Sequence, residues 1–165
     1  MKNFDILVLG SNGLLGSHIV KDLKKRKLNF FTIARSNSNY NLNLKNFKNL
    51  NIFFLKHKFK IVINCIAKTN IDYCNKKFNE ANIINYKMVE YLSKMSKKFG
   101  FKFVQISTDH VYEGKKFKLN NEKSKICAIN GYAKSKILAE KSVKKLKKFL
   151  IIRTNFTGKK KNTFL

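Results

Sequence analysis

Short apolar runs alternate with helix-like stretches along the whole chain. Continuous apolar runs, typical of strands buried on both faces, occupy residues 4–9, 29–34, 60–65, 101–107 and 149–153, and a shorter run covers 42–44. Apolar residues recur at helical spacing in 14–25, 79–99 and 132–147. A further helix is indicated by Phe47, Leu50, Phe54 and Leu55. Residues 35–41 form a polar stretch between two of these elements.

This alternation predicts an α/β fold in one domain that spans residues 1–165. Strands separated by helices are typical of parallel βαβ units, and apolar strands imply that helices cover both faces of the sheet. We therefore expect a Rossmann-type, doubly wound parallel sheet of about six strands. The 44% hydrophobic content and 15 phenylalanines supply a core without disulfides or metal. In the long helix, one face is expected to hold Ile83, Ile84, Met88, Tyr91, Leu92 and Met95.

The strong positive charge has two interpretations. The chain holds 36 Lys and Arg against 9 Asp and Glu, for a net charge of +27. A nucleic-acid surface is one interpretation. The other is the codon bias of an AT-rich gene, which also accounts for the missing proline and for the presence of only three arginines (Arg26, Arg35 and Arg153). We favour codon bias because no recognition motif accompanies the charge, and we expect weak, salt-sensitive polyanion binding but no specific nucleic-acid partner.

Location and metal content follow from what the patterns lack. No apolar run reaches the roughly 18 residues of a membrane span, and the N-terminus passes into the first strand without a signal-peptide pattern. A cytoplasmic protein with no membrane association is expected. Cys65, Cys74 and Cys127 form no C-x-x-C pair, and no His stands at zinc spacing. We therefore expect no metal site.

A glycine-rich turn joins the first strand to the first helix. Gly10 permits the tight turn, Gly13 lets the backbone approach a pyrophosphate, and Gly16 lets the helix pack closely on the sheet. Phosphate charge would then meet the free N–H groups of the helix N-terminus. A purely structural turn is the alternative, but the position between a strand and a helix favours dinucleotide binding. The residues of this site are Gly10, Ser11, Asn12, Gly13, Leu14, Leu15 and Gly16.

The end of the second strand bears on the choice of cofactor. A binder of NAD(H) usually places an acid there to hold the ribose 2′-hydroxyl. The residue nineteen positions after Gly16 is Arg35, and no acid lies between Arg26 and Asp72. A guanidinium offers a bidentate fork to a 2′-phosphate, so NADP(H) is favoured over NAD(H). The alternative is that Arg35 is an exposed loop cation.

A second group of polar residues has the composition of a reductase site. Ser107 and Thr108 end the fifth strand, and Tyr132 with Lys136 opens the next helix. A spacing of four places the phenol and the ammonium on one helix face. A nearby Lys⁺ is expected to lower the pKa of the tyrosine, which makes it a usable acid or base near neutral pH. The strand-end hydroxyl then hydrogen-bonds the substrate oxygen while a hydride moves to or from its carbon.

These motifs together resemble the extended short-chain dehydrogenase/reductase superfamily, and within it the dTDP-4-dehydrorhamnose reductase branch of sugar-nucleotide reductases. The resemblance is carried by residues 10–16, 62–67, 106–112, 132–136 and 152–155. It implies that Thr108, Tyr132 and Lys136 form the catalytic triad. Tyr132 would donate a proton to the C4 carbonyl oxygen of the sugar, and Lys136 would also hold the nicotinamide ribose.

The resemblance assigns further contacts. Backbone at Cys65, Ile66 and Ala67 would line the cofactor, Asp109 and Thr108 would lie near the substrate, and Asn85 would support the active site. The sequence departs from the family at three positions. Asn43 stands where the family has an acidic residue, Ala128 where it has Pro, and Ala133 where it has Gly.

The resemblance covers nearly the whole chain but only about half of a typical family member. The C-terminal part that completes the sheet and shapes the nucleotide-sugar pocket is not matched. The leading hypothesis is an NADP(H)-dependent reductase of a 4-keto nucleotide sugar in cell-surface polysaccharide biosynthesis, or the cofactor-binding part of one. A catalytically silent Rossmann module that binds nucleotide or a partner protein is the alternative, and a basic nucleic-acid-binding protein is a third. A homodimer is left open.

Overall fold

The fold is built on one parallel sheet. The computed structural model describes residues 2–43, 47–114 and 119–156. The strands are β1 (Lys2–Leu9), β2 (Phe30–Ala34), β3 (Tyr40–Asn41), β4 (His57–Asn64), β5 (Lys102–Thr108) and β6 (Phe149–Thr154). Their order is β3-β2-β1-β4-β5-β6, and every neighbouring pair is parallel. This order reverses between β1 and β4, where α/β proteins bind ligands at the carboxyl ends of the strands.

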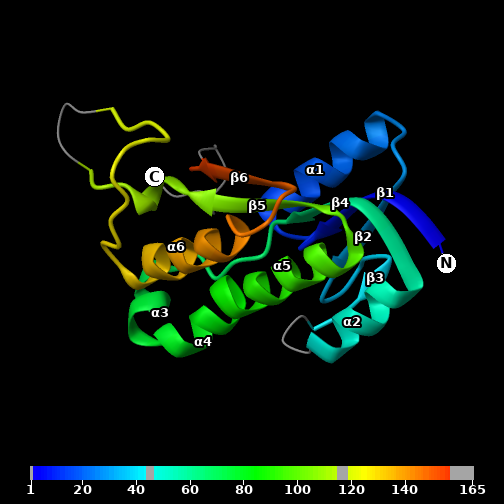
Figure 1. Cartoon of the computed structure of the whole chain (residues 1–165), viewed down its shortest axis with the longest axis horizontal. Helices are drawn as coiled ribbons and strands as arrows, with labels where there is room; N and C mark the ends of the chain where they lie inside the picture. The colour runs from blue at the N-terminus through cyan, green and yellow to red at the C-terminus, as the bar shows by residue number, and fades with distance from the viewer. Residues whose placement is uncertain (1, 44–46, 115–118, 157–165) are drawn as a thin grey trace.

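Helices lie on both sides of the sheet, which confirms the predicted Rossmann-type fold. They are α1 (Leu14–Lys25), α2 (Phe47–Lys56), α3 (Ile71–Lys76), α4 (Phe78–Asn82), α5 (Met88–Phe99) and α6 (Gly131–Val143). Figure 1 shows α1 on one side and α2, α4, α5 and α6 on the other. No helix in the described ranges is long and apolar enough to cross a bilayer.

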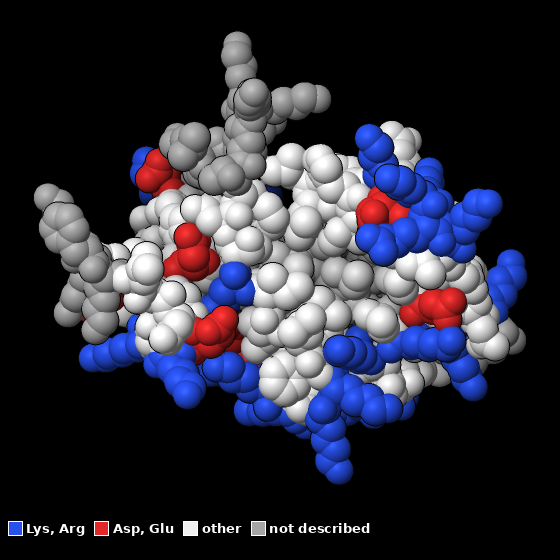
Figure 2. Space-filling model, turned by 90° about the horizontal axis from the view of Figure 1, so that it is seen from above, with Lys and Arg blue, Asp and Glu red and all other residues white. Residues whose placement is uncertain are grey.

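The α1 side of the sheet is open over β5 and β6. Arg153 of β6 points toward α6, so Leu150 and Ile152 point to the opposite face. These two side chains remain 44% and 39% exposed. Figure 2, which views this side, shows a broad area without charged side chains beside a group of Lys and Arg. The part of this face over β5 and β6 is thus uncovered by any described helix and exposes apolar side chains.

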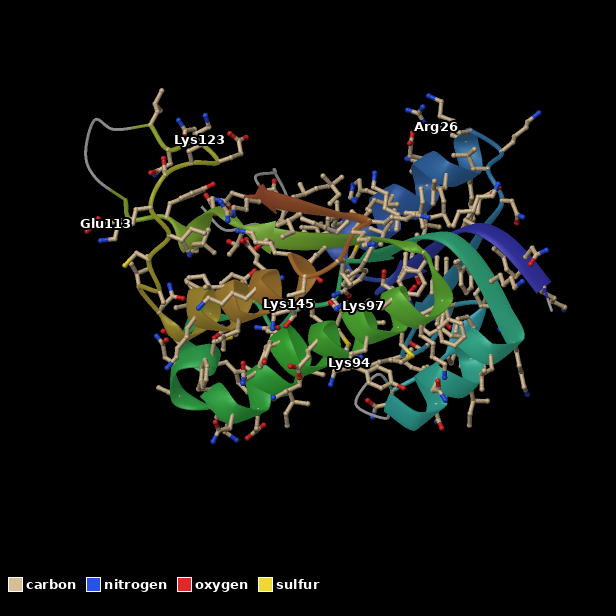
Figure 3. The ribbon with its side chains drawn as sticks, viewed as in Figure 1. Arg26, Lys94, Lys97, Glu113, Lys123 and Lys145 are labelled. Carbon is tan, nitrogen blue, oxygen red and sulfur yellow. The ribbon has the colours of Figure 1, made fainter. Side chains whose placement is uncertain are left out.

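Charged side chains are distributed over both sides of the molecule. Figure 3 shows Arg26 at the end of α1, whereas Lys94 and Lys97 project from α5 and Lys145 follows α6 on the other side of the sheet. All four are exposed. Positive side chains therefore lie on both sides of the sheet, apart from the uncharged area seen in Figure 2.

Several elements differ from the sequence expectation. The helix predicted over 132–147 begins at Gly131 and ends at Val143. The third strand is Tyr40–Asn41 rather than 42–44; Leu42 follows it as a buried residue, and Leu44 lies outside the described residues. Helix α3 was not predicted. It begins after Asn70, whose side-chain oxygen caps it by accepting a bond from the Tyr73 N–H.

The predicted helix 79–99 is interrupted by a π-helical turn, Ile83–Lys87. A π turn adds a residue and shifts the faces of the helix that precede and follow it. Ile83 is consequently 41% exposed, so its expected place on the apolar face is wrong, whereas Met88 and Leu92 are buried as expected. The polar Asn85 is brought fully into the interior instead.

Candidate functional site

A cleft at the carboxyl ends of β1, β4, β5 and β6 brings together the main predicted site residues. Leu15 comes from the start of α1, Thr108 from the end of β5, and Tyr132 with Lys136 from α6. The other described lining residues are Cys65, Ile66, Ala67, Thr69, Ile71, Ile106, Ser107, His110, Thr154, Asn155 and Phe156. The cleft thus joins Leu15 of the glycine-rich turn to the proposed triad, whereas the other residues of that turn and Arg35 are not among its described lining residues.

The glycine-rich turn has the geometry for which its glycines were singled out. Gly10 has a φ of +78°, and its N–H donates to the Ile33 carbonyl at 2.8 Å. The Gly13 N–H donates to the Gly10 carbonyl at 3.0 Å and closes the turn. A Cβ at Gly16 would lie 2.2 Å from the Gly10 oxygen. Helix α1 therefore approaches the turn so closely that only glycine fits there.

The N-terminus of α1 is left open for an anion. Its N-cap, Gly13, has no side chain to accept from the first N–H groups, and the first turn holds no acid. The unpaired donors and the positive end of the helix dipole favour a phosphate. The residues present therefore fit the pyrophosphate of a dinucleotide.

The loop after β2 is held against this turn. The Asn12 amide donates to the Ser36 carbonyl. Asn39 Oδ1 accepts from the N–H and hydroxyl of Thr32, at 3.0 and 2.7 Å. Arg35 extends from this fixed loop into solvent. Its position directly after β2 fits the predicted contact with a 2′-phosphate, and that contact remains a prediction.

Tyr132 is positioned by a close contact between α3 and α6. Asn130 caps α6 by accepting from the Ala133 N–H at 2.8 Å. The Gly131 N–H donates to Asn75 Oδ1 at 2.7 Å, and a Cβ at Gly131 would lie 2.5 Å from the Cys74 carbonyl oxygen. Gly131 is therefore a positioning residue that sequence reasoning missed.

Burial dominates the electrostatics of Tyr132 and Lys136. Lys136 is 2% exposed, and its ammonium donates to the Ile106 carbonyl at 2.6 Å. Burial lowers the pKa of Lys136 to about 8, opposed by Glu140 and Cys65. Burial also raises the pKa of Tyr132 to about 12, opposed by a hydrogen bond with Thr108. The expected lowering of the Tyr132 pKa is therefore wrong here, because burial outweighs the favourable interactions.

The end of β5 orders the residues that follow it. Thr108 Oγ1 accepts from the His110 N–H at 3.2 Å and caps the 3₁₀ turn Asp109–Val111. The Thr108 hydroxyl also donates to Asp109 Oδ1 at 3.3 Å. The His110 ring meets the Tyr132 ring edge-on at 6.1 Å between centroids. His110 is a cleft residue that sequence reasoning did not select.

Asn85 connects two walls of the cleft. Its Oδ1 accepts from the Lys68 N–H at 2.7 Å, and its amide donates to the Lys68 carbonyl and to Ser135 Oγ at 2.9 and 3.0 Å. It thereby holds the segment after Cys65–Ala67 against α6. Burial raises the pKa of Cys65 to about 12, so that thiol stays protonated near neutral pH.

Sequence reasoning also missed a buried polar network. Glu140 Oε1 accepts from the Ser107 hydroxyl at 2.7 Å and from Arg153 Nε at 2.9 Å, and Glu140 Oε2 accepts from Arg153 Nη2 at 2.6 Å. Arg153 Nη1 donates to the Tyr112 hydroxyl at 2.6 Å. The available signal was the presence of polar side chains within apolar strands.

Comparison with known proteins supports one family. A family model described as RmlD substrate binding domain matches residues 4–165. The spore coat polysaccharide biosynthesis protein SpsK of Bacillus subtilis is 29% identical over 152 residues, which cover 92% of this chain and 52% of that protein. A dTDP-4-dehydrorhamnose reductase of Burkholderia thailandensis is 30% identical, over 84% of this chain and 45% of the relative.

Solved structures agree with these matches. A dTDP-4-dehydrorhamnose reductase of Clostridium acetobutylicum superposes with a TM-score of 0.85 at 32% identity, over 97% of this chain and 56% of that one. The same enzyme of Bacillus anthracis, in complex with NADP, gives 0.80 at 27% identity, over 93% and 53%. The chain thus spans about half the length of these relatives.

Proposed function

The chain belongs to the RmlD substrate binding domain family, and from that premise we propose that it binds NADP(H) as the cofactor-binding part of a reductase of a 4-keto nucleotide sugar. One observation carries this proposal: a single cleft brings the start of α1 together with Thr108, Tyr132 and Lys136. The NADP complex of a similar protein supports a nicotinamide cofactor. The related spore coat protein supports a role in polysaccharide biosynthesis.

Each part of the cofactor is assigned to a different segment of the chain. The turn Gly10–Gly16 receives the pyrophosphate, because the first N–H groups of α1 lack side-chain caps. Arg35 receives the 2′-phosphate. Backbone at Cys65–Ala67 lines the nicotinamide half of the cleft, and Lys136 hydrogen-bonds the ribose by turning from the Ile106 carbonyl.

The remaining residues handle the substrate carbonyl. NADPH, when bound, supplies the hydride that reduces the carbonyl carbon. Tyr132 donates a proton to the carbonyl oxygen; its raised pKa of about 12 means that the phenol holds this proton at neutral pH. Thr108 hydrogen-bonds the same oxygen and polarises the carbonyl. Asp109 follows Thr108 and lines an adjoining pocket with His110 and Tyr112, and we assign it to the substrate side.

Cofactor titration tests the binding step. NADPH fluorescence is expected to change saturably with the folded chain, and NADH is expected to bind more weakly. Arg35→Met should weaken NADPH binding by roughly 10- to 100-fold, because a charge-assisted hydrogen-bonded pair is lost, and should leave NADH binding unchanged. Arg26→Met, which removes an exposed cation at the end of α1, is the matched control. Absence of NADPH binding by folded protein contradicts the proposal.

Turnover tests the chemical step. The assay contains dTDP-4-dehydrorhamnose and the chain fused to the C-terminal half of one of its relatives. NADPH oxidation in this assay is expected to vanish in Tyr132→Phe. NADPH binding by that variant should persist, because the ring and its packing remain. Equal turnover by wild type and Tyr132→Phe removes Tyr132 as the proton donor.

A nucleotide-binding module without turnover is the second candidate. The pairing of the Lys136 ammonium with the Ile106 carbonyl favours it, since this arrangement does not activate Tyr132. This candidate predicts saturable NADPH binding with no oxidation by wild type in the same assay. The two candidates therefore differ only in the turnover experiment.

A further inference from the structure

A buried carboxylate and a partly buried guanidinium join four segments next to the cleft. Glu140 in the middle of α6 is 2% exposed, and it holds Ser107 of β5 and Arg153 of β6. Arg153 places its guanidinium 5.1 Å from the centre of the Tyr112 ring and donates to the Tyr112 hydroxyl. The network therefore connects α6, β5, β6 and the residue that follows the 3₁₀ turn.

The register of the sheet places this network directly under the cleft. Ser107 pairs with Arg153, and the next pair is Thr108 with Thr154. Side chains alternate between the two faces of a strand, so Thr108 and Thr154 point away from Glu140. Both of these threonines line the cleft. The bonds to Glu140 thus tie the two strand ends that form the cleft walls to α6.

The energetics favour a geometric role. A buried ion pair pays a large desolvation cost and adds little stability compared with apolar residues of the same shape, whereas its geometry is highly specific. The bidentate Arg153–Glu140 contact fixes two parallel N–H···O bonds. The desolvation of these two charges costs free energy. A role in fixing the geometry of this part of the fold accounts for their presence here.

We propose that Glu140 and Arg153 are positioning residues that fix the nicotinamide end of the cofactor cleft through Ser107, Thr108 and Thr154. This inference rests on the proposed binding of NADP(H). Neither side chain lines the cleft, so both act through the strand ends, and Glu140 in addition raises the pKa of Lys136. The glycine-rich turn, at the other end of the cleft, is held by its own backbone bonds to Ile33 and Gly10. The pair should therefore affect one end of the ligand and leave the other unaffected.

Two ligands separate the two ends of the cleft. NADPH reaches both ends, whereas 2′,5′-ADP carries the adenosine phosphates and no nicotinamide. Arg153→Lys keeps the positive charge and removes the bidentate fork, and Glu140→Gln removes the negative charge with little change of shape. Each variant is expected to bind NADPH about tenfold more weakly, or ~1.4 kcal/mol, and 2′,5′-ADP within about twofold of wild type. Asp22→Asn, which breaks the exposed Asp22–Arg26 pair, should change neither affinity.

The outcomes are distinguishable. Unchanged NADPH affinity in both variants, or an equal loss for both ligands, overturns the positioning role. A wild-type chain that binds neither ligand overturns the proposed function itself. Should either single variant fail to fold, Glu140→Gln with Arg153→Met removes both charges together and leaves no unpaired buried ion. That double variant is expected to show the same selective loss, and wild-type NADPH affinity in it overturns the inference.

Discussion

The interior beneath the sheet has two regions of opposite character. Under β1, β2 and β4, phenylalanines from the strands and from α2 pack ring against ring; Phe53 of α2, for example, stacks on Phe59 of β4 at 5.6 Å between ring centroids. Under β5 and β6, the buried residues include Gln105 and Ser107 of β5 and Glu140 of α6. Buried apolar surface stabilises the first region, whereas specific hydrogen bonds and an ion pair hold the second together.

This difference separates stability from geometry. Apolar packing contributes free energy without fixing one arrangement closely, whereas hydrogen-bonded polar groups fix distances at a desolvation cost. The cleft residues Tyr132 and Lys136 lie on α6 in this polar region, and Thr108 follows Ser107 at its border. The apolar region therefore stabilises the domain on which the costly polar region depends.

Removal of a ring from the apolar region should have the largest effect on stability. Phe54→Ala is expected to lower the free energy of unfolding by about 4 kcal/mol, because it deletes a fully buried ring and leaves a cavity. Urea unfolding measures the loss, with Ile52→Ala on the exposed side of α2 as control. NADPH affinity of the folded variant should be unchanged. A tenfold loss of affinity would show that the two regions are not separate.

Removal of the buried charge from the polar region should stabilise the chain. Lys136→Met is expected to raise the free energy of unfolding at about pH 7 by up to about 3 kcal/mol, because charging Lys136 costs free energy in the interior, and to weaken NADPH binding. The pKa of Lys136 falls from 10.5 to about 8 on folding. Between these values the unfolded chain binds more protons, so wild-type stability should rise with pH in that window.

The pH experiment has an internal control. Lys141→Met, on the exposed side of α6, should keep the wild-type rise between about pH 8 and pH 10, and Lys136→Met should lose it. Tyr132 has the opposite effect on stability. Its pKa is raised from 10.0 to about 12, so above about pH 10 the folded state holds the extra proton and stability falls as the pH rises. An unchanged pH slope in Lys136→Met would contradict the buried charge.

The glycine-rich turn offers a test independent of both regions. Gly16→Ala is expected to cost about 2 kcal/mol and to abolish 2′,5′-ADP binding, because its Cβ overlaps the Gly10 carbonyl. Gly100→Ala is the comparison. Its φ of +78° makes the change cost about 1 kcal/mol, but nothing lies within 4 Å of the added Cβ. Calorimetric titration should show wild-type 2′,5′-ADP binding for Gly100→Ala alone.

The smallest effect is expected at the exposed ion pair of α1. Asp22→Asn should change the free energy of unfolding by less than about 0.5 kcal/mol, because both partners are more than half exposed and screened by solvent. Urea unfolding at low and high salt measures it. An effect as large as that of Glu140→Gln would remove the distinction between buried and surface charges.

The sequence predicted the features that depend on local pattern. Helix Leu14–Lys25 has the predicted bounds, and the strands of the confirmed fold follow the apolar runs. The glycine positions were predictable because backbone sterics act within a few residues. The π-helical turn was not, since Asn85 enters the interior through bonds to Lys68 and Ser135, which lie far from it in the sequence.

Long-range polar bonds account for the other differences. Ser107, Glu140 and Arg153 belong to three elements, and periodicity gives no signal for their pairing. The pKa of Tyr132 depends on how deeply α6 packs against α3, which local spacing does not contain. Polar residues inside apolar strands, such as Asn64 and Gln105, which bond each other at 2.9 Å, are the sequence signal to follow.

The open face of β6 has a consequence for the behaviour of the protein in concentrated solution. Among the described residues β6 is an edge strand, and an edge strand with exposed Leu150 and Ile152 invites pairing between copies of this chain; natural edges usually carry lysines that prevent it. The only charged residue of β6 is Arg153, whose side chain points inward to Glu140. Colloidal stability therefore depends on the net charge of +27, through mutual repulsion of whole molecules. At about 1 M salt, screening limits that repulsion to a range of roughly 3 Å. We then expect copies of the chain to associate through the exposed face of β6.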